Sequence, residues 1–495
     1  MRSAARPAKS RPASPVPVPL IVTGVILSGL ASLVLAQAGV VGLLAVGALG
    51  GLAIVLLVVR QRELFVLLVM IASLQFVFHK SIGPVATDVS GGAPSVYITS
   101  VDVSLLVLYG LWIASGTFAR EIVTIWGKPV FMLPLVAIAS TLPSLLVAPN
   151  LFLGFGELVR MVWMYALFVY VALRVRSRRD VALVIGTLFI VAIAQFAVSV
   201  LQWRTGSSLG LGFLGEEQAL GVRSLDGSEI ARPSGTVVHS DFLAALVAPI
   251  ALFASALSVE LRRGPWVRAA CIALTAIGAA TLFLAQARAA MVGFGGGIFV
   301  LVGWYMLRGR ISLRLVALTG GVLLFVAILF GGVIADRLLG NFGTDHFQLE
   351  VRSRVELNDL ALAMIGDNAV IGVGLNNFEQ VMDRYDRYGL IFADNPVHNL
   401  YLLVTTETGI VGALGFALSA GAVGLAALRA ARLTGLLGAT GAAVAAIVVF
   451  FGLEELLTFS LRQDMPLAIF WLAAGLAVAC ARIDRRERAS TSVPA

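Results

Sequence analysis

Charged side chains are scarce in this chain, and cysteine is almost absent. Only 13% of the 495 residues are Asp, Glu, Lys or Arg, whereas 59% are hydrophobic, and the mean hydropathy is +0.95. So little charge excludes soluble domains as the bulk of the chain. The two cysteines, Cys271 and Cys480, lie in apolar runs, so we expect neither a disulfide framework nor a cysteine metal site.

The short alternating segments of a transmembrane β-barrel are also lacking. Instead, the sequence has continuous apolar runs of about 20 residues, each long enough to cross the hydrocarbon core as a helix. We therefore predict an all-α, polytopic transmembrane bundle of about 12 to 14 spans. The predicted spans lie near residues 17–37, 40–59, 63–79, 101–118, 129–148, 157–174, 181–202, 239–259, 267–286, 289–307, 314–333, 396–417, 438–458 and 466–482.

The net charge of +8 does not indicate a nucleic-acid partner, because the basic residues lie between spans rather than on one soluble face. Of the 36 Lys and Arg residues, 24 fall in the N-terminal tail, in alternate loops and after the last span. By the positive-inside rule, both termini are then cytoplasmic. The basic start resembles a signal peptide, but it lacks an evident cleavage site and is read as a tail before a retained helix.

Five regions follow from this topology. We predict a disordered basic cytoplasmic tail, a transmembrane helical region, a large extracytoplasmic cap loop, C-terminal transmembrane helices and a cytoplasmic tail, with boundaries at 1–16, 17–333, 334–395, 396–482 and 483–495. Apolar residues at helical spacing in 352–367 and 377–389 predict two cap helices, separated by a turn at 370–377. A loop of this length is usually functional, and we expect a partly helical cap over a membrane cavity.

The segment DNPVHNLYLLVTTETGIVG, residues 394–412, passes abruptly from polar residues into a span. Asn395 suits an N-cap and Pro396 the first helical position, which would place His398 in the first turn. The positive end of the helix dipole favours a neutral imidazole there, which is the state that a general base needs. The alternative is a polar interfacial residue that only caps the span.

Two carboxylates accompany this histidine. Asp394 could orient the imidazole ring, or it could be a solvated loop carboxylate. Glu407 lies nine residues beyond His398 and therefore falls on the opposite face of the helix, which makes it an unlikely partner.

Arg288 has apolar neighbours on both sides, in FLAQARAAMVGFGGG. A charge in that position is costly unless it is paired or lines a wet cavity, so it is a functional candidate. The alternative is an interfacial arginine that extends to the lipid headgroups. The glycines that follow, Gly293 and 295–297, resemble a nucleotide loop only superficially and favour close helix packing.

The other polar candidates lie near the same outer face. Glu157 and Arg160 could simply pair with each other, and Arg232 and His239 flank a large outer turn. The predicted cap helix opens with two further arginines, Arg352 and Arg354. For any one of these arginines, a local salt bridge is the alternative to a functional role.

Four ordered stretches resemble the O-antigen ligase and polymerase family of bacterial membrane glycosyltransferases. They cover roughly residues 230 to 415 and read RPSGTVVHSDFLAAL, QARAAMVGFG, RVELNDLALAMIGDNAVIGVGLNNF and HNLYLLVTTETGIVGALGF. These are similar, in order, to an Arg, Gly, then His pattern before a span, an arginine at a tight outer turn, a cap helix followed by a Gly-Val-Gly turn, and a His-Asn span with a Glu-x-Gly-x-x-Gly tail.

The resemblance implies a GT-C-like bundle and a transferase without metal or cofactor. The donor would be a glycan on a polyprenyl diphosphate such as undecaprenyl diphosphate, and the acceptor a glycan, a lipid or a protein. Transfer would occur on the outer side of the cytoplasmic (inner) membrane, in cell-envelope polysaccharide biosynthesis, and a single displacement would invert the anomeric centre.

Site residues carry over by position. His398 would be the general base, Arg288 would act with it in catalysis, and Arg288 and Arg354 would bind the diphosphate with Arg232 as a further contact. The secondary candidates are Arg160, Arg352, His239 and Asp394. A polysaccharide or lipid-linked sugar transporter, or flippase, is the alternative function. The gathering of distinctive residues at one face favours an enzyme.

Overall fold

A computed structural model describes residues 61–76, 79–82, 85–86, 91–217, 220–225, 228–261, 264–312, 345–387 and 396–491. The chain divides into two compact units, residues 1–65 and 66–495. Of the first unit only residues 61–65 are described. The predicted tail 1–16, the predicted spans 17–37, 40–59 and 314–333, and Asp394 lie outside the described residues.

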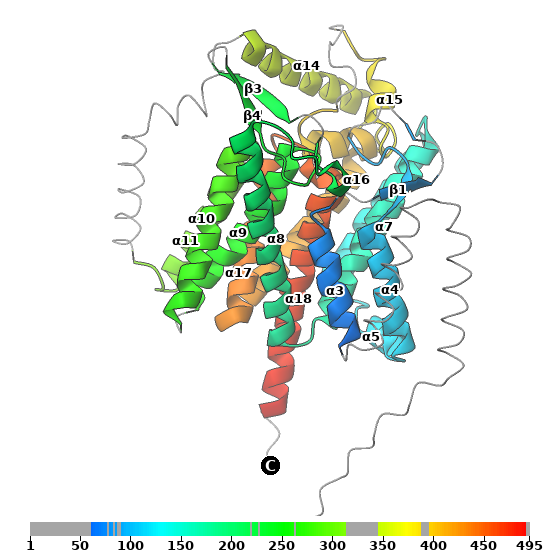
Figure 1. The fold of residues 1–495 in the computed structure, drawn as a ribbon. Coiled ribbons are helices and arrows are strands. Elements are labelled where there is room, and N and C mark those ends of the chain that lie inside the picture. The colour runs from blue at the N-terminus through cyan, green and yellow to red at the C-terminus, as the bar shows by residue number, and fades with distance from the viewer. Residues whose placement is uncertain are drawn as a thin grey trace, which may run out of the picture. The chain divides into compact units, whose positions relative to one another are not determined.

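Long apolar helices dominate the described part of the chain (Figure 1). Nine segments in it are long and apolar enough to cross a membrane. They are α6 (Pro129–Thr141) with η2 (Leu142–Leu146), α7 (Leu151–Arg174), α8 (Arg178–Thr205), α9 (Ser240–Glu260), α10 (Pro265–Ala285), α11 (Arg288–Leu307), α16 (Leu400–Ala431), α17 (Gly435–Glu454) and α18 (Asp464–Thr491). Each coincides with a predicted span, so the polytopic all-α class is confirmed.

Two predicted spans are shorter in the structure. The span predicted at 63–79 corresponds to α3 (Arg62–Ser73), and that predicted at 101–118 to α4 (Ser100–Ala114). Thr99 fixes the start of α4, because its hydroxyl accepts a hydrogen bond from the Asp102 amide while the Asp102 carboxylate accepts one from the Thr99 amide. A short helix, α5 (Phe118–Val123), follows α4.

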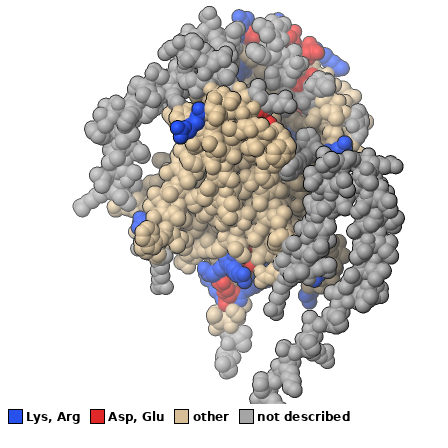
Figure 2. Space-filling model, viewed as in Figure 1, with Lys and Arg blue, Asp and Glu red and all other residues tan. Residues whose placement is uncertain are grey.

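The predicted basic loops gather at one end of the bundle, opposite α14 (Figure 1). Arg178 pairs with Glu487 at 2.8 Å, and Arg308 donates to the carbonyl oxygen of Ala431 at 2.9 Å. In the view of Figure 2, charged side chains lie mainly toward the two ends of the molecule and other residues fill the middle. This distribution agrees with helices that run between two polar surfaces.

Helices α9, α17 and α18 form the interior of the bundle. Their buried positions are mainly small or aliphatic, and neighbours approach closely where glycine occurs. A Cβ atom on Gly278 of α10 would lie 2.4 Å from the Cβ of Ala251 in α9. Such contacts suit helices in lipid, where small residues permit the backbone approach that supplies packing energy.

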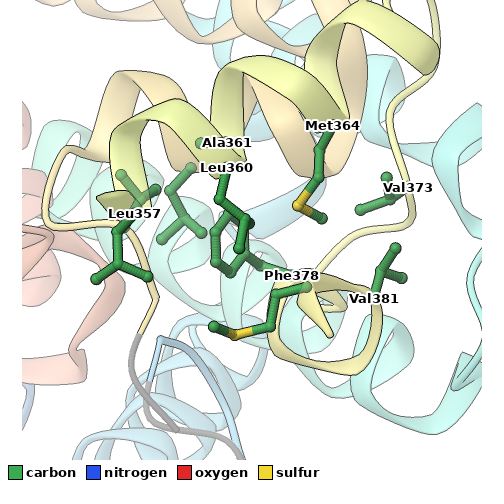
Figure 3. Packing of buried hydrophobic residues seen from close by; sticks show 10 residues of the cluster. Leu357, Leu360, Ala361, Met364, Val373, Phe378 and Val381 are labelled. Carbon is green, nitrogen blue, oxygen red and sulfur yellow. The ribbon is translucent and has the colours of Figure 1, made fainter. Parts of the chain in front are cut away.

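The cap consists of two helices above one end of the bundle, α14 (Asp345–Asp367) and α15 (Phe378–Met382). Their apolar side chains form a cluster that we call the cap core (Figure 3). Its buried members are Leu357, Leu360, Ala361, Met364, Val373, Phe378, Val381, Met382, Val397 and Leu403, and Tyr385, Leu402 and Phe459 pack against it. The cap core therefore joins α14 and α15 to the start of α16.

Both cap-helix predictions need correction. The first helix does not open at Arg352, because α14 begins at Asp345. The second was predicted over 377–389, but α15 ends at Met382. Phe378, Val381 and Met382 already complete its contact with the cap core.

The sequence also failed to predict two short hairpins. Strands β1 (His79–Ile82) and β2 (Val96–Thr99) pair antiparallel with His79 opposite Thr99. Strands β3 (Gly221–Leu225) and β4 (Ser228–Arg232) pair with Gly221 opposite Arg232. The second hairpin, with η3 (Gly212–Leu214), lies in the loop between α8 and α9 and carries Arg232 at its end.

Candidate functional site

The cap and α16 meet where α16 departs from helical geometry. Gly409 has φ +64° inside α16, and the Ile410 amide donates to the Ala369 carbonyl oxygen at 2.9 Å. Val373 and Gly374 donate to the carbonyl oxygens of Thr406 and Glu407. The Gly-Val-Gly turn and the Glu-x-Gly motif are separate patterns in the sequence. In the structure the two segments contact each other.

Only glycine fits at two points of this contact. Gly372 has φ +71°, and a Cβ atom there would lie 2.4 Å from the Glu407 carbonyl oxygen. A Cβ atom on Gly409 would lie 2.1 Å from the carbonyl oxygen of Val370. Both positions combine a left-handed backbone with close backbone approach, which other residues tolerate poorly.

The start of α16 is bound to the loop between α17 and η4 (Ser460–Arg462). The Leu400 amide donates to the carbonyl oxygens of Glu455 at 2.9 Å and Thr458 at 3.1 Å. The Tyr401 hydroxyl donates to the carbonyl oxygen of Gly452 at 2.7 Å. We call residues 455–459 the α17–η4 loop.

His398 lies just before α16. The prediction that it lies in the first turn of this helix was wrong. Asn399 is the N-cap, because its side-chain oxygen accepts from the amides of Tyr401 and Leu402. The imidazole is partly buried, and its ring centroid lies 5.2 Å from that of Phe459 in an edge-on arrangement. His398 thus contacts the α17–η4 loop and stays close to the amino end of α16.

Arg354 reaches the same loop from the cap. Its Nη1 donates to the carbonyl oxygen of Leu457 at 3.0 Å. Arg352, two residues earlier, is exposed and pairs with Glu356 on its own helix at 2.6 Å. Arg354 therefore contacts the same loop as His398. Arg352 forms the local salt bridge that was the alternative to a functional role.

Arg288 is the first residue of α11, after a turn in which Gln286 has φ +53°. Gly293 lies against Phe450 of α17 and Gly297 against Ala446, so the two helices run antiparallel. Extending this register by five residues places Arg288 level with the C-terminal end of α17. Gly293, Gly296 and Gly297 serve helix packing, as predicted, whereas a Cβ atom on Gly295 would meet nothing within 4 Å.

Arg232 is joined to the turn before Arg288. Its Nε donates to the carbonyl oxygen of Ala285 at 3.1 Å, and its Nη2 pairs with Asp241 at 2.8 Å. His239 is the N-cap of α9, because its Nδ1 accepts from the Asp241 amide. Helix capping therefore accounts for His239, whose side chain is 45% exposed.

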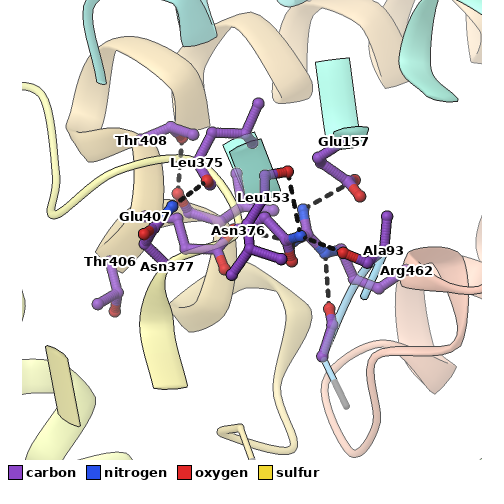
Figure 4. A network of polar contacts seen from close by, with 12 residues as sticks. Ala93, Leu153, Glu157, Leu375, Asn376, Asn377, Thr406, Glu407, Thr408 and Arg462 are labelled. Carbon is purple, nitrogen blue, oxygen red and sulfur yellow. Dashed lines mark hydrogen bonds and ion pairs between the residues drawn. The ribbon is translucent and has the colours of Figure 1, made fainter. Parts of the chain in front are cut away.

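Sequence reasoning missed the centre of a buried ionic network, Arg462 (Figure 4). The Arg462 guanidinium lies 3.0 Å from a carboxylate oxygen of Glu157 and 3.0 Å from one of Glu407. It also donates to the side-chain oxygen of Asn376 at 3.1 Å and to the carbonyl oxygen of Gly91 at 2.9 Å. One side chain therefore joins α7, α16, the cap and residue 91.

Arg160 belongs to this network and pairs with Glu157 at 2.5 Å, as the alternative interpretation held. Its guanidinium also donates to the carbonyl oxygen of Arg462 and lies 3.7 Å from Asp464. One signal in the sequence could have pointed to this network. Glu407 is an ionisable residue inside an apolar run, and such a residue requires a partner. In the described residues, no three His, Cys, Asp or Glu side chains group as metal ligands would.

Residues 272–417 match a family model described as O-antigen ligase. The comparison with curated proteins finds no match. The matched region extends from α10 through the cap to the first half of α16 and contains Arg288, Arg354 and His398, while Arg232 and Arg462 lie outside it. This match covers 146 of the 495 residues, and it supports the resemblance to the O-antigen ligase and polymerase family that the motifs and the polytopic fold indicate.

Proposed function

We propose that this protein transfers a glycan from a polyprenyl diphosphate to an acceptor hydroxyl, as a polysaccharide ligase or polymerase. The observation that supports the proposal is that Arg354 and His398 contact the same α17–η4 loop, at Leu457 and Phe459 respectively. Both come from the region that matches the O-antigen ligase model. A cation for the leaving group and a base for the nucleophile are the two groups that this reaction needs.

The donor supplies its own leaving group, since a glycosyl diphosphate departs readily once its charge is balanced. Arginine suits this task because its planar guanidinium forms paired hydrogen bonds with phosphate oxygens. We assign the diphosphate to Arg288 and Arg354. Arg232 is a further contact, because its bonds to Asp241 and Ala285 engage only part of its five donors.

The acceptor hydroxyl is a poor nucleophile and needs a base beside it. His398 would accept its proton while the acceptor oxygen attacks the anomeric carbon and the bond to the diphosphate oxygen breaks. The amino end of α16 favours neutral imidazole, the form that can accept a proton. One displacement of this kind inverts the anomeric configuration, and the two arginines would replace a metal ion.

The site would face the extracytoplasmic side of the inner membrane, with both termini in the cytoplasm. The basic residues at the end opposite the cap support this orientation, because short cytoplasmic loops are enriched in Lys and Arg. Transport of a lipid-linked sugar, the alternative, would use arginines along a path through the membrane. The family match favours transfer.

A direct test is to incubate the purified protein with a polyprenyl-diphosphate oligosaccharide and candidate glycan, lipid and peptide acceptors, with and without EDTA. We expect a product whose mass equals acceptor plus glycan, in equal amounts under both conditions. A product that forms only without EDTA would overturn the arginine mechanism. Movement of the donor across a vesicle membrane without any product would favour transport.

A further inference from the structure

A cavity is lined by Gln463 and Asp464, which follow η4 in the chain. Its volume is about 250 Å³, and it lies between the end of α3, β2 and the start of α4, α9 and the start of α18. Its hydrogen-bonding lining includes Tyr97, Ser100, Gln463 and Asp464, and its apolar lining includes Phe76 and Phe242. Apolar walls with a few fixed polar groups are typical of a small-molecule site.

The charged residues that line this cavity argue against a diphosphate as its ligand. Its acidic group is Asp464, whose side chain is 31% exposed. The neighbouring cation, Arg160, is 6% exposed and already pairs with Glu157 at 2.5 Å and with Asp464 at 3.7 Å. A carboxylate would repel a phosphate group, whereas it accepts hydrogen bonds readily from neutral hydroxyls.

The polar groups of the lining are of the kinds that hydrogen-bond with hydroxyls. Tyr97 forms a side-chain hydrogen bond with Asp464, and desolvation raises the pKa of the Tyr97 hydroxyl, which therefore stays protonated. The two carboxylate oxygens of Asp464 offer about four acceptor positions in all. The aromatic ring of Phe242 adds an apolar surface, so the lining suits a ring that has hydroxyls on its rim and C–H groups on its faces.

We propose that this cavity is a subsite for one neutral sugar ring of a glycan substrate, away from the bond that reacts. The proposal rests on the proposed transfer function. The chain passes from Phe459, which His398 contacts, through η4 to Gln463 and Asp464. A glycan that extends past η4 could place one sugar here while another presents its hydroxyl or its anomeric carbon near His398. Binding energy from such a remote unit positions the reacting one.

The test uses the full-length protein in nanodiscs and saturation-transfer NMR with methyl glycosides of glucose, galactose, mannose, rhamnose and N-acetylglucosamine. We expect at least one glycoside to receive saturation from the wild type. Asp464→Asn removes a hydrogen-bonding charge and Phe242→Trp fills the cavity, so each should weaken that signal by about fivefold or more. Phe242→Trp leaves the Arg160 network intact and is the variant to use if Asp464→Asn does not fold.

His398→Ala is the matched control, and it should leave glycoside binding unchanged. Absence of any signal, or a signal that the cavity variants leave unchanged, would overturn the subsite. So would loss of the signal in His398→Ala alone, or displacement of the glycoside by inorganic diphosphate, because either places the sugar at the transfer site. These readouts need no turnover, so their failure is distinct from failure of the transfer function.

Inhibition kinetics with the glycoside that binds can determine whether the donor glycan or the acceptor occupies the subsite. Competition with the acceptor supports the subsite and assigns it to the acceptor. Competition with the donor supports the subsite and assigns it to the donor glycan. Inhibition that Phe242→Trp leaves unchanged would contradict the subsite, because the inhibitor would then bind elsewhere.

Discussion

Arg462 and Glu407 form a buried ion pair at 3.0 Å that joins η4 to the N-terminal part of α16. Both side chains are nearly inaccessible, with 6% and 1% exposed. Glu157 holds the same guanidinium from α7 at 3.0 Å. The network therefore fixes η4, and with it the loop that Arg354 and His398 contact.

Arg462→Met should lower the free energy of unfolding by about 3–5 kcal/mol, because it leaves Glu407 buried without its cation and leaves Glu157 with Arg160 alone. Reversible unfolding in bicelles measures this. The matched control is Arg488→Met, since the Arg488 side chain is 74% exposed and pairs with Asp484 on its own helix. This substitution should change stability by less than about 1 kcal/mol. Equal effects of the two substitutions would contradict the role of the network.

Gly409→Ala should destabilise the junction of cap and bundle by about 1–3 kcal/mol, because of the positive φ and the contact with Val370. Gly421→Ala is the control in the same helix, since a Cβ atom there meets nothing within 4 Å. That substitution should be neutral or stabilise by up to about 1 kcal/mol. Similar melting temperatures for the two variants would argue against the docking contact.

Gly293→Leu should separate α11 from α17 and so displace Arg288, because even a Cβ atom would lie 2.6 Å from the Phe450 carbonyl oxygen. Both thermal stability and donor binding should fall. Gly295→Leu faces open space and should affect neither. Normal donor binding in Gly293→Leu would show that the position of Arg288 does not depend on this packing.

Arg354→Ala should reduce kcat/KM for the donor by about 10- to 100-fold, the effect of losing one or two charge-assisted hydrogen bonds. Arg352→Ala removes an arginine of the same helix that pairs only with Glu356 in the structure, and it should change kcat/KM by less than about twofold. Steady-state kinetics distinguish the two. The assignment of Arg354 fails if both variants lose activity equally.

Local patterns in the sequence predicted what depends on near neighbours. The apolar runs located the spans, and three-residue spacing gave the Glu157–Arg160 pair as the alternative to a functional role, which the structure shows. The predicted start of α16 was wrong because asparagine is a good N-cap residue and occurs at both 395 and 399. The side chain of Asn399 caps the helix. The Asp345 start of α14 lies in a stretch without an apolar pattern.

Contacts between distant segments could not be predicted in this way. Helical periodicity put Glu407 on the face away from His398, but it could not identify Arg462, which follows a later helix. Likewise, the two glycine motifs around residues 372 and 409 are recognisable singly, and only the fold shows that they meet. The hairpin β3–β4 was missed although its signal is local, since Asp226-Gly227 between the two strands is a dipeptide typical of two-residue hairpins.

The most direct test of the site separates donor binding from transfer in three variants of the purified protein. With a polyprenyl-diphosphate oligosaccharide as donor, His398→Ala should bind the donor normally and form no product. Arg288→Ala and Arg354→Ala should each bind it more weakly by about tenfold or more. Product formation at the wild-type rate by His398→Ala, with donor affinity unchanged in both arginine variants, would contradict the account.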